Sequence, residues 1–192
     1  TNIDKENKLV EFEKTIFYGK SGGQPGDTGI IKVKNKEINV IDTIKKNNNI
    51  YHEVSDIENI EIGNEIIGSI NWEQRYKYMK MHTALHLLCS AVPMDVTGGQ
   101  IGLEKSRLDF NANANSINKE KVQEKINEIL NNNHLITYEW ISKKELDKKP
   151  ELIRTMSVKP PETEGKIRLV KVGEIDLQPC GGTHVKETNE IG

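Results

Sequence analysis

Two pairs of residues in this chain have the types and the spacing of a metal site. Near the C-terminus, Cys180 and His184 are four residues apart with two glycines between them, so a flexible loop can turn both side chains toward one point. Much earlier in the chain, His82 and His86 have the i, i+4 spacing that places both imidazoles on one face of a helix. Thiolates and imidazoles are the usual zinc ligands, most often four around one ion. The four residues are therefore our predicted metal ligands.

A third helical residue, Cys89, offers an alternative ligand. It follows His82 by seven positions and His86 by three, so one helix could hold all three around an ion. Cysteine is also among the most buried residue types and packs as a small hydrophobic side chain. We expect Cys89 to belong to the core. His52 and His134 have no partner at ligand spacing and are expected at the surface.

The helix that must carry the two histidines follows from hydrophobic periodicity. Apolar side chains recur at helical spacing from residue 72 to about 91, with Asn71 as N-cap and Pro93 after the end. A second helix is expected from about residue 118 to 130, with Ser116 as its cap. These helices should lie on a mostly antiparallel sheet, which makes the C-terminal part α+β.

The other elements of this part are read from local signals. Ser142 and Glu145 form a capping-box pattern, so a short helix should start there and stop before Pro150. Alternating or β-branched residues and glycine-rich or proline-rich stretches predict three strands (107–110, 135–141 and 166–172) and two loops (96–102 and 158–164).

The first 70 residues have the pattern of short strands joined by turns. Strand-like runs are separated by Asn47-Asn48-Asn49 and by similar turn residues, which suggests a small barrel-like or sandwich domain. The segment 21–29 contains four glycines and a proline and must be a loop. We therefore expect a β-rich domain at 1–70 and the metal-binding domain at 71–192.

Composition excludes several classes of protein. A hydrophobic content of 35% and a charged content of 29% fit a globular chain rather than a disordered one. No apolar run approaches the roughly 20 residues that cross a bilayer. The net charge of -2 excludes a globally basic nucleic-acid-binding coat. Two cysteines are too few for a disulfide framework, and we expect a reducing, cytoplasmic setting with a thiolate metal ligand.

Several motifs together resemble one family. His82-Thr83-Ala84-Leu85-His86, followed by Cys180-Gly181-Gly182-Thr183-His184, resembles the editing domain of alanyl-tRNA synthetases and, more closely, the freestanding AlaX alanyl-tRNA editing proteins. The segment 21–29 is similar to the glycine-rich motif of their N-terminal barrel domain. Residues 97–102 and 107–110 resemble the segment after the zinc helix. The resemblance covers nearly the whole chain in order.

The resemblance implies an aminoacyl-tRNA hydrolase. Its substrate would be tRNA(Ala) carrying serine, and also glycine, and its cofactor would be zinc. The implied zinc ligands are His82, His86, Cys180 and His184. The resemblance also implies that Thr83 and Gln100 lie beside the aminoacyl group, as candidate catalytic residues, and that the loop of Gly22, Gly23 and Gln24 closes over the same pocket. We add Thr183 and Asp109 as further candidate substrate-binding residues. No stretch resembles the ATP-binding aminoacylation core, so we expect editing without synthesis of aminoacyl-tRNA.

Three features of the mechanism stay open at this stage. An ester needs a positioned water and a stabilised oxyanion, which zinc can supply, but catalytic zinc usually has three protein ligands rather than four. Either the ion expands its coordination, one ligand yields, or zinc only orients the substrate. A hydrogen bond from Thr83, Gln100 or Thr183 to the serine hydroxyl would select against alanine. Asp109 is a possible general base, but we favour a structural role in which it bonds to Arg107 or to a neighbouring backbone group.

Three other functions have features in common with this sequence. A metalloprotease is excluded, because the helical motif lacks the glutamate that serves as general base. Editing of Ser-tRNA(Thr), as in threonyl-tRNA synthetases, remains an alternative. So does a zinc-stabilised tRNA-binding module without catalysis, which would have the same four ligands.

Overall fold

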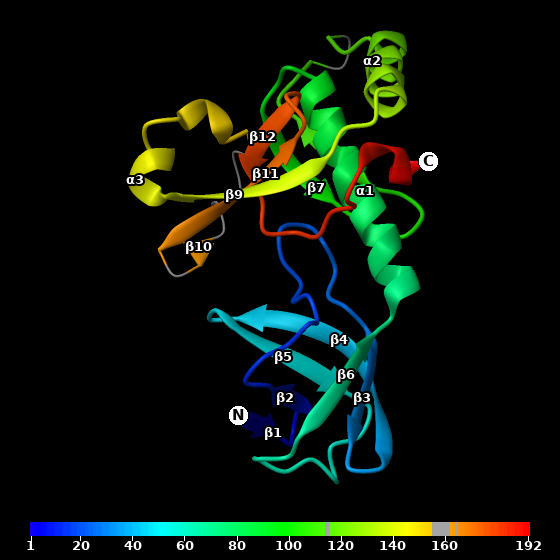
Figure 1. Cartoon of the computed structure of the whole chain (residues 1–192), viewed down its shortest axis with the longest axis vertical. Coiled ribbons are helices and arrows are strands. Elements are labelled where there is room, and N and C mark those ends of the chain that lie inside the picture. The colour runs from blue at the N-terminus through cyan, green and yellow to red at the C-terminus, as the bar shows by residue number, and fades with distance from the viewer. Residues whose placement is uncertain (114–115, 155–161, 164) are drawn as a thin grey trace. The chain divides into compact units, whose positions relative to one another are not determined.

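The computed structural model describes residues 1–113, 116–154, 162–163 and 165–192, which form two compact units. The units are Thr1–Lys77 and Tyr78–Gly192, and their boundary falls inside helix α1 (Trp72–Ala91) (Figure 1). Antiparallel sheets with a few helices confirm the predicted α+β class. The assignment of separate functions to residues 1–70 and 71–192 stays a prediction.

The first unit is built on a six-stranded antiparallel sheet with the order β1-β2-β5-β4-β3-β6. Its strands are β1 (Asn2–Asp4), β2 (Leu9–Glu11), β3 (Gly29–Val33), β4 (Lys36–Lys46), β5 (Asn49–Val54) and β6 (Ile66–Ile70). Alternate residues of β3 and β4 point inward, as the period of two in a strand requires. The core of the unit includes Ile31, Val33, Ile38, Val40 and Val54, all nearly inaccessible to solvent.

The turn between β4 and β5 confirms the turn predicted at Asn47-Asn48-Asn49. Asn47 and Asn48 have φ angles of 51° and 67°. A two-residue hairpin loop needs positive φ at both positions, which asparagine tolerates better than most residues.

The glycine-rich segment is a loop, as predicted. Gly22 and Gly23 have φ angles of 55° and 81° at the centre of a turn in which Ser21 and Gln24 exchange backbone hydrogen bonds. A Cβ on Gly26 would lie 2.0 Å from the carbonyl oxygen of Thr43, so only glycine fits there. The loop therefore packs directly against β4.

His52 is buried, and the prediction that it lies at the surface is wrong. Its Nδ1 is 3.0 Å from the carbonyl oxygen of Val10, and its Nε2 is 2.7 Å from Thr15 Oγ1. Its ring stacks on Phe12 with centroids 4.1 Å apart. Hydrogen bonds at both nitrogens offset the cost of burying a polar ring, which spacing along the sequence cannot reveal. His134, the other histidine predicted to lie at the surface, is half-buried.

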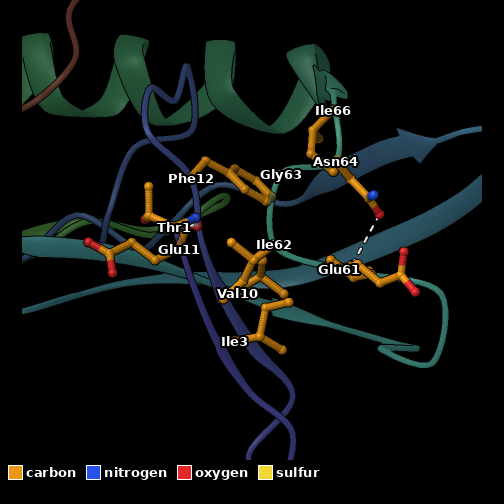
Figure 2. Close-up of a pocket in the computed structure, with 11 residues that line it drawn as sticks. Thr1, Ile3, Val10, Glu11, Phe12, Glu61, Ile62, Gly63, Asn64 and Ile66 are labelled. Carbon is orange, nitrogen blue, oxygen red and sulfur yellow. Dashed lines mark hydrogen bonds between the residues drawn. The ribbon is translucent and has the colours of Figure 1, made fainter.

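A small pocket in the first unit lies beside β1, β2 and the loop before β6 (Figure 2). Val10, Phe12 and Ile62 are among its lining residues. Its volume of about 30 Å³ has room for roughly one or two water molecules. It is too small for an aminoacyl nucleoside, and its lining includes none of the predicted site residues.

The second unit combines α1 with a four-stranded antiparallel sheet and a two-stranded ribbon. Strand β11 is paired with β9 on one side and β12 on the other, and β10 also pairs with β11. The elements are β7 (Val96–Gln100), β8 (Arg107–Phe110), α2 (Lys119–Asn131), β9 (Ile136–Ser142), α3 (Lys143–Leu146), β10 (Glu162–Thr163), β11 (Lys166–Val172) and β12 (Asp176–Pro179), with 3-10 helices at Pro150–Leu152 and Thr188–Ile191. Within the described residues, no helix has both the length and the apolar character that a membrane span requires.

Most predicted elements of this unit are present, with three corrections. The side chain of Asn118, not that of Ser116, caps α2 by accepting a hydrogen bond from the backbone N–H of Lys121. Asn71 caps α1 in the same way, and the capping box between Ser142 and Glu145 is complete. Of the predicted loop at 158–164, residues Glu162–Thr163 instead form strand β10, and residues 158–161 and 164 lie outside the described residues.

The third correction concerns residues 96–102, predicted as a loop. Residues Val96–Gln100 form strand β7, which pairs with β8. Glycines usually weaken a strand, but here they make room for the partner strand. A Cβ on Gly98 would lie 2.9 Å from Asp109 Oδ2, and one on Gly99 would lie 2.9 Å from Leu108 Cδ2.

Candidate metal centre

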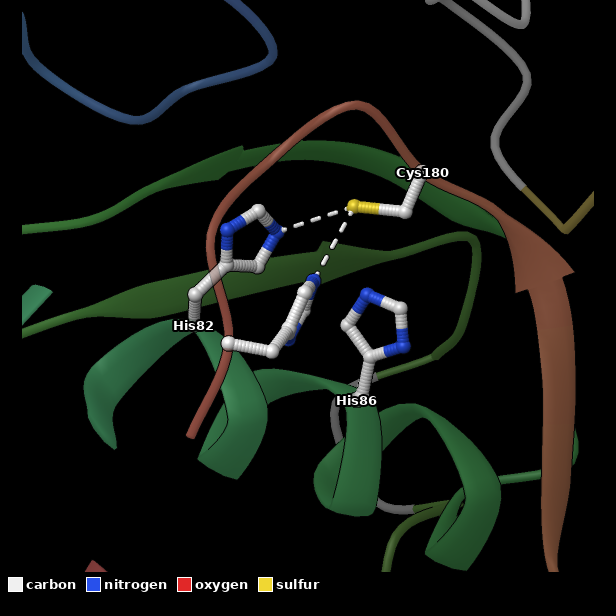
Figure 3. Close-up of side chains that lie close together, drawn as sticks. His82, His86 and Cys180 are labelled. Carbon is white, nitrogen blue, oxygen red and sulfur yellow. Dashed lines mark hydrogen bonds between the residues drawn. The ribbon is translucent and has the colours of Figure 1, made fainter. Parts of the chain in front are cut away.

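Helix α1 supplies two imidazoles to a buried cluster. His82 and His86 are one helical turn apart, and their rings project from the same face of α1 toward Cys180 (Figure 3). Their exposed fractions are only 8% and 5%. Asn71 caps the start of the helix, and the apolar side chains of Leu85 and Leu87, which neighbour His86 in the sequence, are buried. These contacts hold the helix, and with it the two imidazole rings, in a fixed position.

The loop after β12 supplies a thiol and a third imidazole. Cys180 and His184 are both buried, and the backbone N–H of Gly182 lies 3.3 Å from Cys180 Sγ as a hydrogen-bond donor. Arg168 on β11 holds the loop in place, since its Nε donates to the Cys180 carbonyl at 2.9 Å and its guanidinium also donates to the Gly182 carbonyl. The loop conformation is thus fixed by a charged side chain and not only by its glycines.

The structure brings the four predicted ligands together. One nitrogen or sulfur atom from each of His82, His86, Cys180 and His184 lies within 4.8 Å of the others. Cys180 Sγ is 3.5 Å from His82 Nε2 and 3.3 Å from His184 Nε2. Bonds to zinc of about 2.0–2.3 Å at tetrahedral angles put ligand atoms about 3.3–3.8 Å apart. The four buried residues could therefore hold a metal ion, with small adjustments of the side chains.

The outward nitrogen of His86 meets a carboxylate. His86 Nδ1 lies 3.0 Å from Asp176 Oδ2, and the Gln178 amide donates to the same carboxylate oxygen at 2.8 Å. A carboxylate can only accept, so Nδ1 carries a hydrogen and Nε2 is the atom that can bind a metal once its own proton is lost. Metal-ligating histidines commonly make this contact, which fixes the ring and its tautomer.

The outward nitrogen of His184 meets a hydroxyl group. Thr83 Oγ1 donates to the Met79 carbonyl at 2.9 Å and lies 3.2 Å from His184 Nδ1. Its one hydrogen is then in use, so His184 Nδ1 must donate to it. The Val185 backbone N–H donates to the same oxygen at 3.3 Å. Thr83 is fully buried and orients His184, whose Nε2 faces Cys180 Sγ.

The charges of the cluster are strongly coupled. Burial opposes ionisation of the Cys180 thiol, but the three neighbouring imidazoles outweigh it and hold the thiol pKa well below its ordinary value. Burial also opposes protonation of His86, yet the hydrogen bonds to Asp176 and Cys180 raise its pKa to about 9. Burial and the two other imidazoles lower the pKa of His184 to about 3. In the metal-free cluster at neutral pH, His86 is therefore protonated and His184 neutral, and the thiolate form of Cys180 is favoured.

The remaining predicted site residues lie outside the four-residue cluster. Gln100 is exposed at the end of β7, opposite Arg107 in β8, and Thr183 is half-buried in the loop between Cys180 and His184. Asp109 is partly exposed, with Oδ2 3.8 Å from the Arg107 guanidinium. Gly22, Gly23 and Gln24 belong to the first unit. Roles for all six in substrate contact stay predictions.

Cys89, the alternative ligand, is buried and is not part of the four-residue group. Burial raises the pKa of its thiol, in contrast to Cys180. A protonated thiol is a poor metal ligand.

Three residues of the site were missed by sequence reasoning. Asp176 and Gln178 precede Cys180 by four and two positions, and alternate residues of a strand share one face. That alternation was the available signal, although the contact with His86 depends on how the strand packs against α1. Arg168, which holds the loop, carried no local signal.

Two family models match the chain. The model described as tRNA synthetases class II (A) matches residues 2–74, and the model of the threonyl and alanyl tRNA synthetase second additional domain matches residues 167–192. The second match contains Cys180 and His184 as well as Asp176 and Gln178 of strand β12.

Several curated proteins are similar over nearly the whole chain. The alanyl-tRNA editing protein AlaX-M of Methanosarcina acetivorans is 35% identical, with 97% of this chain and 81% of that protein aligned. The alanyl-tRNA editing protein AlaX-L of Pyrococcus horikoshii is 38% identical over 100% of this chain and 48% of its own length. An alanine–tRNA ligase of Methanococcus maripaludis is 34% identical over 96% of this chain, but only 21% of the ligase is covered.

Proposed function

Because the chain belongs to the family of alanyl-tRNA editing proteins, we propose that it hydrolyses the ester between tRNA(Ala) and a wrongly attached amino acid. Serine is the main proposed substrate, with glycine as a second. The observation that supports this proposal most directly is the buried group of three histidines and one cysteine, in a chain that aligns with 81% of an editing protein.

The proposed metal is zinc, held by His82, His86, Cys180 and His184. Three features of this donor set fit zinc: it mixes thiolate with imidazole, it is buried, and both His86 and His184 have a hydrogen-bond partner at the outward nitrogen. Bound zinc would supply a positive charge that polarises the ester carbonyl.

The side chains around the cluster have two kinds of proposed role. Asp176 and Thr83 orient His86 and His184 and hold the protons on their Nδ1 atoms. The hydroxyl of Thr83 already serves Met79, Val185 and His184, so we assign it positioning rather than contact with substrate. Gln100 and Thr183 remain the candidates for the hydrogen bond that distinguishes serine from alanine.

Deacylation assays test the proposal. The protein should hydrolyse Ser-tRNA(Ala), and more slowly Gly-tRNA(Ala), while leaving Ala-tRNA(Ala) and Ser-tRNA(Thr) intact. Cys180→Ala should remove the activity, whereas Cys89→Ala should keep it after correction for any loss of folded protein.

Two outcomes would replace the proposal by the alternatives. Preferential hydrolysis of Ser-tRNA(Thr) would show threonyl-type editing. Binding of tRNA(Ala) with no hydrolysis of any of these esters would show a zinc-stabilised binding module.

A further inference from the structure

Strand β9 presents two aromatic side chains to solvent on one face. Tyr138 and Trp140 are 47% and 53% exposed. They are two residues apart, so they point to the same side of the sheet. Large aromatic groups on an edge strand are costly to leave in water and unusual without a partner.

The sheet register connects these side chains to the metal centre. Trp140 pairs with Arg168 on β11, and the Cys180 backbone N–H donates to the Arg168 carbonyl at 3.1 Å. Trp140, Arg168 and Cys180 therefore form one row across the sheet. Tyr138 and Gln178 both pair with Val170 in the next row. Residues that pair across antiparallel strands share a face, so the aromatic pair and the metal loop lie on the same face.

The distance between them suits a nucleotide. Neighbouring strands are about 4.8 Å apart, so two strand spacings separate Trp140 from Cys180 by about 10 Å. The adjacency of β9, β11 and β12 can be followed in Figure 1. An ester held at the metal centre has its ribose, base and preceding nucleotide within that reach.

Arg168 contacts both Tyr138 and the loop of the metal centre. Its guanidinium lies 4.9 Å from the Tyr138 ring centroid as a cation–π contact, and it also donates to the Cys180 and Gly182 carbonyls. The arginine thus fixes one face of Tyr138 and adds positive charge beside the aromatic rings. Lys166, exposed and two residues away on the same face, adds a second charge.

We propose that Tyr138 and Trp140 form a stacking platform for the unpaired bases at the 3′ end of the aminoacylated tRNA. Bases stack on exposed aromatic side chains whatever their sequence, and nearby arginine and lysine neutralise the phosphates. The identity of the occupant rests on the proposed function. By holding the terminal base, the platform would position the adjoining ester at the metal centre.

The two tryptophans of the chain make a direct test possible. In a Trp72→Phe protein, Trp140 is the only tryptophan, and its fluorescence should be quenched by a short RNA ending in CCA. The same RNA with an abasic terminal ribose should bind roughly 5- to 100-fold more weakly, the range expected for loss of one stacked base. Tyr138→Leu in this background should weaken binding of the intact RNA to a similar degree.

The reciprocal protein is the matched control. In Trp140→Phe, the remaining Trp72 should report no quenching by the RNA. Equal quenching of Trp140 by the intact and the abasic RNA would overturn the platform and leave only phosphate binding. Emission of Trp140 that depends on protein concentration and not on RNA would overturn it in favour of contact with a second copy.

Kinetics separate this inference from the proposed function. Tyr138→Leu should raise KM for Ser-tRNA(Ala) about tenfold while kcat stays close to that of the parent. A parent protein that binds the RNA base-dependently but hydrolyses no ester contradicts the proposed function and leaves the platform standing. Hydrolysis without base-dependent binding contradicts the platform alone.

Discussion

His86 and Asp176 are 90 residues apart in the chain, yet His86 Nδ1 lies 3.0 Å from Asp176 Oδ2 inside the protein. This contact joins helix α1 to strand β12. It fixes which nitrogen of His86 faces the cluster. It also places a negative charge at Nδ1, on the opposite side of the ring from the nitrogen that would bind a metal cation.

Loss of the Asp176 charge should weaken metal binding. Asp176→Asn keeps the shape of the side chain but removes the carboxylate, and zinc affinity should fall about 10- to 100-fold. Competition with a chromogenic chelator measures this directly. Glu174→Gln, at a nearby exposed carboxylate paired with Lys171, is the control and should bind zinc like the parent. Equal affinities for Asp176→Asn and the parent would contradict the orienting role.

The hydroxyl of Thr83 should matter for stability as well as for the metal. Thr83→Val leaves the buried donors of His184 and Val185 without an acceptor, which costs about 1–3 kcal/mol. Urea denaturation of the metal-free protein measures the loss. Thr83→Ser retains the oxygen and should recover most of it. If Thr83→Val instead unfolds like the parent and changes only the ratio of serine to alanine hydrolysis, then Thr83 contacts the substrate.

Metal affinity should rise with pH. In the metal-free protein the pKa of His86 is raised to about 9, so its Nε2 carries a proton at pH 7 that a metal must displace. Apparent zinc affinity should increase by up to about tenfold for each pH unit below 9 and level off above it. Chelator competition between pH 6.5 and 9.5 measures the slope. An affinity independent of pH across this range would show that His86 is neutral before metal binds.

The first unit should lose stability in mild acid through His52. Burial lowers the pKa of His52, outweighing the opposing hydrogen bond to the Val10 carbonyl. The unfolded chain therefore binds a proton at higher pH than the folded protein does, and stability decreases as the pH falls below about 6.5. The urea midpoint should drop between pH 7.5 and 5.5. His52→Gln should show a smaller drop, and an unchanged drop in this variant would assign the effect to other groups.

Spacing along the chain was enough to predict that His82, His86, Cys180 and His184 meet, because two short-range patterns each fix a pair of side chains. The helix bounds and the capping box were equally readable, since they depend on local hydrogen bonds.

Features that depend on tertiary packing were not readable. The burial of His52 requires Val10, its partner on the neighbouring strand β2, and Thr15, which are 42 and 37 residues away in the sequence. The strand at Val96–Gln100 requires side chains of β8 to fill the space above its glycines. The row that joins Trp140 to Cys180 exists only in the register of β9, β11 and the loop after β12.

The measurement that tests the central claim most directly is the rate of Ser-tRNA(Ala) deacylation during stepwise addition of zinc to the chelated, folded protein. We predict negligible hydrolysis without metal, a linear rise and a plateau at about one zinc per chain, since one group of four ligands holds one ion. Full activity of the chelated protein, with its metal content verified as zero, would contradict the account.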